Sequence, residues 1–214
     1  MKPLKTELQD AETLRDLGSA SVQIVHDLKN QLNGLKLYAT FLRKRMEKAE
    51  RPADEQETLA KLISGLERAA ADMTVLVRFG RALELRRQPG TDLARLLRDS
   101  AEGAHVEFDG GPFEGDFDPV LLAEALKNIT AGALGESAAA DGGSKVRLSG
   151  DGSAALIEWQ AVAAQADADG EDPFRSLAGA SGLRMALAAK IVRAHGGEVS
   201  SEGGRIRARL PLEK

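Results

Sequence analysis

The first part of the chain carries apolar residues in steps of three and four, which is the spacing of an amphipathic helix. A first stripe consists of Leu14, Leu17, Val25, Leu28, Leu32, Leu35, Ala39 and Leu42. A second stripe consists of Leu59, Leu62, Leu66, Ala70, Met73, Val77 and Leu83. The polar run between them contains Pro52, which fits the first turn of a helix and disrupts a helix interior. The pattern predicts two long helices in an antiparallel hairpin over residues 1–88.

The predicted hairpin has a wider apolar face than a single neighbouring helix covers. Pairing two hairpins into a four-helix bundle buries the excess. The sequence therefore predicts a homodimer. The alternative is that the hairpin packs only against the C-terminal half of its own chain.

After Pro89 the pattern changes to shorter elements. Helices are expected over TDLARLLRDSAEG, DPVLLAEALKNITAGAL and GLRMALAAKIVRAHGG, with Thr91 or Asp92 capping the first and Asp118 starting the second. Strands are expected over HVEFDG, on both sides of the turn GDGS, and on both sides of EGG. This order predicts an α+β sandwich with a mixed sheet over residues 89–214.

Composition narrows the function classes. The 214 residues include 29 basic and 33 acidic ones, and a formal charge of -4 does not suit general nucleic-acid binding. The absence of cysteine excludes disulfides, a cysteine nucleophile and a cysteine zinc site. No apolar run approaches the roughly 20 residues that span a bilayer, and the N-terminus has no signal-peptide pattern. We expect a cytoplasmic protein with neither nucleic acid nor a membrane as partner.

Four segments in this order resemble the core of the sensor histidine kinases of two-component systems: VHDLKNQL, LLAEALKNITAGAL, DPF and GLRMALAAKIVRAHGGEVSSEGGRIRARLPL. That family has a dimerising hairpin with a phosphoacceptor histidine, followed by an ATP-binding domain of the Bergerat fold. The resemblance implies that His26 is the phosphoacceptor and becomes a phosphohistidine. It implies that Asp27 helps to take the imidazole proton and that Lys29 and Asn30 are the polar positions that follow.

The helical pattern around His26 agrees with this assignment. His26 follows Val25 of the apolar stripe by one residue, which is a rotation of about 100°. This rotation places His26 on a polar ridge, where a neutral imidazole is a competent nucleophile for phosphorus. The alternative is an ordinary solvated helix histidine.

The nucleotide-binding positions of the family are altered in this chain. On the first helix of that domain Asn128 is retained, whereas the second asparagine, the usual magnesium ligand, is replaced by Gly132. Before the last helix Gly182 is retained, and Arg184 replaces a glycine whose backbone would approach a phosphate. Arg184 has the alternative of contacting a phosphate directly, and Gly182 that of packing the helix onto the sheet.

The adenine-binding loop is also altered. Ala161 stands near the position of the expected aspartate, and no D-x-G-x-G follows. The acidic segment 167–172 comes too late and is interpreted as a solvated loop, with a displaced nucleotide contact as the alternative. We expect that this degenerate domain has lost ATP binding and that the chain binds no cofactor. With three scattered histidines no metal site is predicted, and His195 at a helix end is interpreted as structural.

These features favour a histidine phosphotransferase of a bacterial phosphorelay, which passes phosphoryl groups between response-regulator aspartates through His26. The receiver domain of the partner is expected to supply Mg²⁺. One alternative is an active or weakly active histidine kinase that autophosphorylates His26 from ATP. The other is a non-catalytic pseudokinase adaptor.

Overall fold

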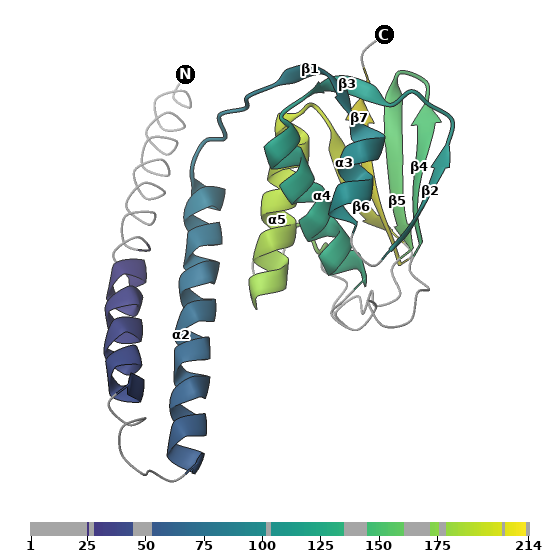
Figure 1. Ribbon diagram of the computed structural model, residues 1–214. Helices are drawn as coiled ribbons and strands as arrows, with labels where there is room; N and C mark the ends of the chain where they lie inside the picture. Colours follow the sequence, from purple (N-terminus) through teal and green to yellow (C-terminus); the bar gives the residue numbers. More distant parts are fainter. Residues whose placement is uncertain are drawn as a thin grey trace, which may run out of the picture. The chain divides into compact units, whose positions relative to one another are not determined.

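The computed structural model describes residues 25, 28–44, 53–101, 104–134, 145–160, 172–175, 179–202 and 204–212. The chain forms two compact units, Met1–Ala82 and Leu83–Lys214. Figure 1 shows a helical first unit and a second unit in which helices lie against a sheet. His26, Asp27, Ala161 and the segment 167–171 lie outside the described residues.

The first unit is the predicted antiparallel hairpin. Helix 28–44 packs against α2 (Ala53–Gly80), and the two helices run in opposite directions (Figure 1). Ala39 lies buried in a small cluster with Leu59 and Ile63, which Leu66 completes. Beside this cluster Lys36 Nζ pairs with Glu67 Oε1 at 2.8 Å. Residues late in one helix therefore meet residues early in the other, as an antiparallel hairpin requires.

Helix α2 ends earlier than the sequence pattern indicates. The stripe extends to Leu83, but the helix stops at Gly80. Glycine is less favourable in a helix than alanine by about 1 kcal/mol, and the Arg81 N–H closes the last turn by donating to Val77 O at 3.2 Å. Leu83 therefore begins the second unit and does not extend the apolar stripe of the hairpin.

The second unit is an α+β sandwich. Its five-stranded sheet has the order β2 (His105–Asp109), β4 (Lys145–Asp151), β5 (Ala154–Gln160), β7 (Arg205–Pro211) and β6 (Glu198–Glu202). The pair β2–β4 is parallel and the other neighbours are antiparallel, so the sheet is mixed as predicted. Strands β2 and β6 form its edges. In Figure 1 the helices α3 (Leu93–Ser100), α4 (Pro119–Leu134) and α5 (Gly179–Ala194) cover one face of the sheet.

Alternation along the strands separates a buried face from a solvent face. Ile157 and Trp159 on β5 are fully buried, and Glu158 between them faces solvent. Trp159 Nε1 donates to the Thr130 hydroxyl of α4 at 2.9 Å, which satisfies both buried polar groups. The buried face thus packs on the helices, and the other face carries charged side chains.

Two short strands were not predicted. Strand β1 (Gln88–Asp92) pairs antiparallel with β3 (Glu114–Phe117) in a separate two-stranded sheet. The sequence of β1, QPGTD, contains proline and glycine and is typical of a turn. Its pairing is long-range and depends on the arrangement of the folded unit, so local pattern does not indicate it. Asp92 at its end caps α3 by accepting from the N–H groups of Ala94 and Arg95, as predicted.

Candidate functional site

The predicted phosphoacceptor precedes helix 28–44 of the hairpin in the sequence. His26 and Asp27 themselves lie outside the described residues. On helix 28–44 Lys29 is half-buried and Asn30 is exposed. The following turns of this helix carry apolar side chains, several of which are exposed to solvent.

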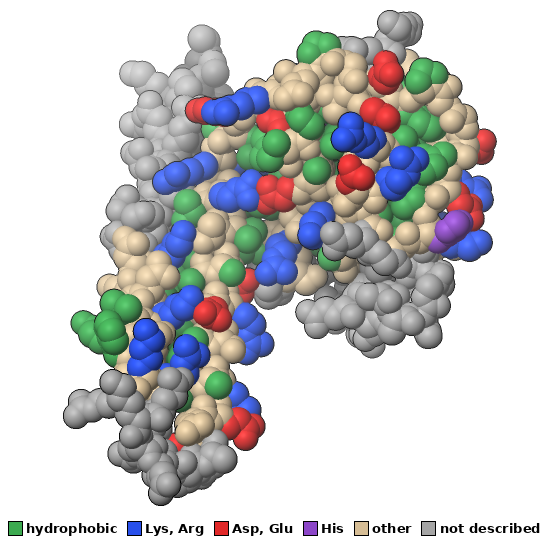
Figure 2. Space-filling model, viewed as in Figure 1, with side chains coloured by type: hydrophobic (Ala, Val, Ile, Leu, Met, Phe, Trp, Pro, Cys, Tyr) green, Lys and Arg blue, Asp and Glu red, His purple; other side chains and the backbone are tan. Residues whose placement is uncertain are grey.

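One face of the hairpin exposes two heptad-spaced apolar rows. On the first helix the row is Leu28, Leu35 and Leu42, and on α2 it includes Leu62 and Leu76. The contact line of the two helices is given by Ala39 on the first helix and by Leu59 and Ile63 on α2. From this line the rows are rotated by about 20–60° and about 60–140°, in the same rotational sense along each chain. Because the helices are antiparallel, equal rotational senses lead to the same face. In Figure 2 apolar side chains gather on the surface of the hairpin. We call this surface, defined by the five leucines, the leucine face.

A second apolar surface lies on the opposite side of the first helix. Leu37 and Phe41 are one turn apart and are 54% and 58% exposed. They are rotated by about 160–200° from Ala39, so they point away from α2. Gly34 lies one turn before Leu37 with nothing within 4 Å of its Cβ position. We call Gly34, Leu37 and Phe41 the outer patch.

The degenerate nucleotide positions lie on α4 and α5, which pack against each other. Asn128 and Gly132 are half-buried on α4, and on α5 Gly182 is half-buried and Arg184 is exposed. The Met185 side chain packs directly on Gly132, so that a methyl group built there would overlap its Sδ and Cγ atoms. Met185 itself is buried.

The contact of Met185 with Gly132 decides whether the described residues of α4 and α5 are able to hold a magnesium nucleotide. At the position of the second asparagine there is no side chain to bind a cation, and Met185 occupies the space that an asparagine would need. A thioether is a poor ligand for Mg²⁺, which prefers oxygen. Among the described residues no group of acidic or histidine side chains is arranged to hold a metal ion. The described residues of α4 and α5 therefore do not fit the metal nucleotide.

A buried polar cluster joins α4, α5 and the segment that enters the second unit. His195 is almost fully buried, its Nδ1 lies 2.8 Å from Ile191 O, and its Nε2 accepts the Asp118 N–H at 3.0 Å. The ring is therefore neutral, with its proton on Nδ1. Burial lowers the pKa of His195, and the positive charge of Arg87 lowers it further. This arrangement confirms the structural interpretation of His195.

Asp118 connects the same cluster to the start of the unit. Its Oδ1 accepts from the N–H groups of Val120 and Leu121, and so caps α4, while Oδ2 accepts the Arg86 N–H at 2.7 Å. Burial raises the pKa of Asp118, but the hydrogen bonds from Leu121, Arg86 and Val120 outweigh it and hold this pKa below its usual value.

Arg87 fixes the end of α5. Its guanidinium donates to Ala194 O at 3.0 Å and to Asp116 O at 3.3 Å. A cation at a helix C-terminus is favourable because the last carbonyls carry partial negative charge. Sequence reasoning missed Arg86 and Arg87; the pair of arginines before the turn QPG was the available signal, but its partners lie far along the chain.

Comparison with known proteins supports the same class of fold. No protein-family profile and no curated protein sequence matches this chain. Among solved structures, full-length ShkA in complex with AMPPNP is similar with a TM-score of 0.63 and 20% identity, over 90% of this chain and 45% of ShkA. The histidine kinase ThkA in complex with the response regulator TrrA is similar with a TM-score of 0.58 and 14% identity, over 98% of this chain and 66% of the other.

These similarities agree with the order and packing of the elements. The chain has the fold of a sensor histidine kinase core, with a helical hairpin followed by a Bergerat-type sandwich. It spans less than half of the length of ShkA. None of the described helices is both long and apolar enough to cross a membrane.

Proposed function

We propose that this chain is a histidine phosphotransferase of a phosphorelay. In this proposal His26 receives a phosphoryl group from the aspartyl phosphate of one response-regulator receiver domain and passes it to the aspartate of another. The contact between Met185 and Gly132 is the observation that supports the proposal most strongly. The chain has a histidine kinase fold, but this contact makes the packing of α4 on α5 unsuitable for a magnesium nucleotide. A protein that takes its phosphoryl group from a partner has no need of that site.

The proposed transfer balances within the two proteins. A ring nitrogen of neutral His26 attacks phosphorus with its lone pair, a P–N bond forms, and the P–O bond breaks with its electron pair on the donor carboxylate. Asp27 takes the proton from the other ring nitrogen. In the second transfer the acceptor carboxylate attacks phosphorus, the P–N bond breaks, and the imidazole regains its proton. The receiver domain is expected to supply the Mg²⁺ that neutralises the phosphoryl oxygens.

The two apolar surfaces of the hairpin support two kinds of partner. The leucine face suits a second copy of the hairpin, because pairing buries both rows in a four-helix bundle. The outer patch is left open by such pairing and lies on helix 28–44, which follows His26 in the sequence, so it is a surface on which a receiver domain that reaches His26 would dock. The similar ThkA structure is a complex with the response regulator TrrA.

A histidine kinase remains the second candidate. ShkA, to which the chain is similar, is described in complex with AMPPNP, an analogue of ATP. Asn128 and Gly182 retain two of the family's nucleotide-binding positions. This candidate predicts that His26 is labelled by ATP with no receiver present. A pseudokinase adaptor predicts no label from either source.

The deciding experiment offers the intact protein two phosphoryl donors separately. One arm contains gamma-labelled ATP with Mg²⁺, and the other contains receiver domains that carry labelled aspartyl phosphate. We expect label on the protein from at least one receiver, loss of that label in His26→Ala, and retention of it in His105→Ala. His105 is exposed and lies in the other unit, so it is the matched control for removal of a histidine.

Each remaining result contradicts the proposal in a different way. Label on His26 from ATP at a rate comparable to that from receivers makes the chain a kinase. Absence of label from ATP and from the whole receiver panel makes it an adaptor. Label that survives His26→Ala places the phosphoacceptor elsewhere.

A further inference from the structure

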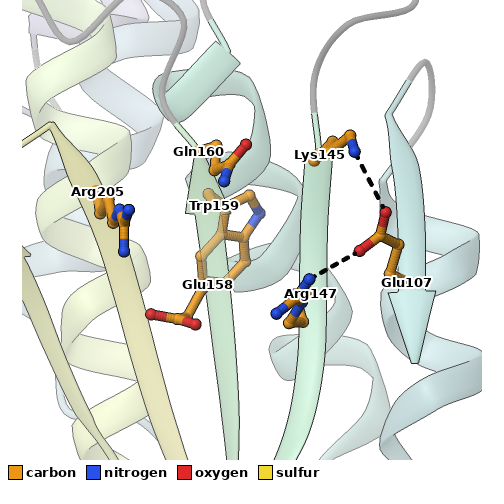
Figure 3. A pocket seen from close by; sticks show the side chains of 7 residues that line it. All are labelled: Glu107, Lys145, Arg147, Glu158, Trp159, Gln160 and Arg205. Carbon is orange, nitrogen blue, oxygen red and sulfur yellow. Dashed lines mark hydrogen bonds and ion pairs between the residues drawn. The ribbon is translucent and has the colours of Figure 1, made fainter. Parts of the chain in front are cut away.

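The solvent face of the sheet in the second unit contains a hollow. It has a volume of about 250 Å³ and lies over β5, between β4 and β7. Its charged and polar lining is Glu107, Lys145, Arg147, Glu158, Gln160 and Arg205. Figure 3 shows Lys145 and Arg147 on one side of β5 and Arg205 on the other. We call it the outer-face hollow; the helices α3, α4 and α5 lie on the other face of the sheet.

Strand register explains why these side chains meet. Gln160 on β5 stands opposite Arg205 on β7. On the other side, Trp159 of β5 pairs with Val146 of β4, so Lys145 lies at the next position along β4, beside Gln160. Two residues along, Glu158 stands opposite Arg147 and Arg207. Because side chains alternate across a strand, all of these residues project from the same face. Strands β4 and β7 are separated by β5, which puts them about 9.5 Å apart.

The charges of the hollow do not cancel. Glu107 pairs with both Lys145, at 3.5 Å, and Arg147, at 3.2 Å, so the β4 wall keeps one positive charge in excess. Glu158 at the floor is paired with Arg207 at 2.9 Å. Arg205 forms no ion pair with any residue that the structure describes. Glu202 on β6 stands opposite Arg205 in register without forming an ion pair with it. The β4 wall therefore keeps one positive charge in excess, and the opposite wall presents the guanidinium of Arg205.

We propose that the outer-face hollow binds a small dicarboxylate. One carboxylate accepts hydrogen bonds from the Arg205 guanidinium, which presents paired N–H donors suited to a carboxylate. The second carboxylate lies against Lys145 and Arg147, and the Gln160 amide between the walls donates to either end. Cationic side chains on both walls suit a ligand with a carboxylate at each end.

This proposal is independent of phosphotransfer, because none of the lining residues belongs to the hairpin. It gives the second unit a ligand of its own, through which a metabolite would act on the protein. Binding is therefore measured on the unphosphorylated full chain. Succinate is the probe, titrated at constant ionic strength and followed by calorimetry and by amide chemical shifts.

We expect saturable binding of succinate that weakens about tenfold in Arg205→Gln and in Lys145→Gln, since each substitution removes one charge-assisted hydrogen bond. Arg209→Gln is the matched control. Arg209 projects from the same strand and face but pairs with Asp151 at 2.8 Å, outside the lining, so its removal leaves the affinity unchanged. Arg205→Lys retains the charge and is expected to recover part of the affinity.

Three results overturn the proposal. Succinate that fails to saturate shows that the hollow is not a binding site. Equal weakening in Arg209→Gln shows diffuse attraction to a charged face. If pyrophosphate or acetate binds more tightly than succinate, the hollow does not select dicarboxylates. Circular dichroism of each variant establishes that its fold is retained, as expected for exposed side chains.

Discussion

At the scale of single residues, the cluster of Asp118, His195, Arg86 and Arg87 does most to define the second unit. Every polar atom that the structure describes in Asp118 and in the imidazole of His195 has a partner. The partners come from the entry segment, from α4 and from the end of α5, which are distant in sequence. A small set of hydrogen bonds thus fixes where the unit begins and how its two long helices start and stop.

This cluster predicts a dependence of stability on pH. The pKa of His195 is below 6.5 in the folded protein because of burial, whereas in the unfolded chain it is about 6.5. Below about pH 6.5 the unfolded state binds more protons. The stabilisation is complete above that pH, and it is lost as the pH falls through the folded pKa. We expect the free energy of unfolding to decrease on acidification from pH 7.5 to pH 5, measured by denaturant titration.

The fluorescence of Trp159 reports this unfolding, since it is the only tryptophan of the sequence and is buried beside α4. His195→Gln should cost about 1–3 kcal/mol at neutral pH by leaving buried groups unpaired, and should flatten the pH dependence. The control His105→Gln alters an exposed side chain and should change neither. An unchanged slope in His195→Gln would assign the pH dependence to other groups.

At the scale of elements, the contact of α4 with α5 closes the space that a side chain at position 132 would need. Gly132 permits the close approach and Met185 fills the space above it. Two opposing effects act on the substitution Gly132→Ala. Helix propensity favours alanine by about 1 kcal/mol, and overlap with a packed neighbour costs about 1–3 kcal/mol.

A double-mutant cycle separates these effects. With Met185 present, we expect Gly132→Ala to leave stability unchanged or to lower it. In a Met185→Ala background the overlap is absent, so Gly132→Ala should stabilise by about 1 kcal/mol. The coupling energy, again from Trp159 fluorescence in denaturant, should be about 1–3 kcal/mol. Equal effects of Gly132→Ala in both backgrounds would show that Met185 does not press on α4.

The elements also show how far the sequence predicts the fold. Strands β4, β5 and β7 alternate between buried and more exposed positions over most of their length because one face is buried, and Asp92 and Asp118 mark the starts of α3 and α4. Strands β1 and β3 were missed because their local sequences favour turns and their pairing is long-range. The loss of the second asparagine is visible at Gly132, but its replacement by the Met185 side chain is a tertiary contact and leaves no local pattern.

At the scale of the whole molecule, the two apolar surfaces of the hairpin predict different phenotypes. Leu62→Glu places a charge on the leucine face and should raise the dimer dissociation constant at least about a hundredfold, because each leucine is buried twice in a symmetric dimer. Light scattering measures this constant. Leu37→Glu is the matched substitution on the outer patch, and it should leave the dimer intact while slowing transfer from receivers.

The opposite pattern would exchange the roles of the two surfaces. A wild-type protein that is monomeric at micromolar concentration would contradict the dimer altogether. Light scattering thus decides the state of assembly, and transfer from receivers decides the partners.

The edge strand β6 bears on whether a dimer of this chain would grow into larger assemblies. An edge strand presents unpaired backbone groups on which another sheet can add, and repeated addition produces fibres. Strand β6 is only five residues long, and it begins and ends with glutamate, Glu198 and Glu202. Two copies brought together edge to edge would oppose like charges at a short ladder. In the proposed dimer, association through the leucine face would be closed by symmetry at two copies, and the charged edge would oppose its extension through β6 into an open polymer.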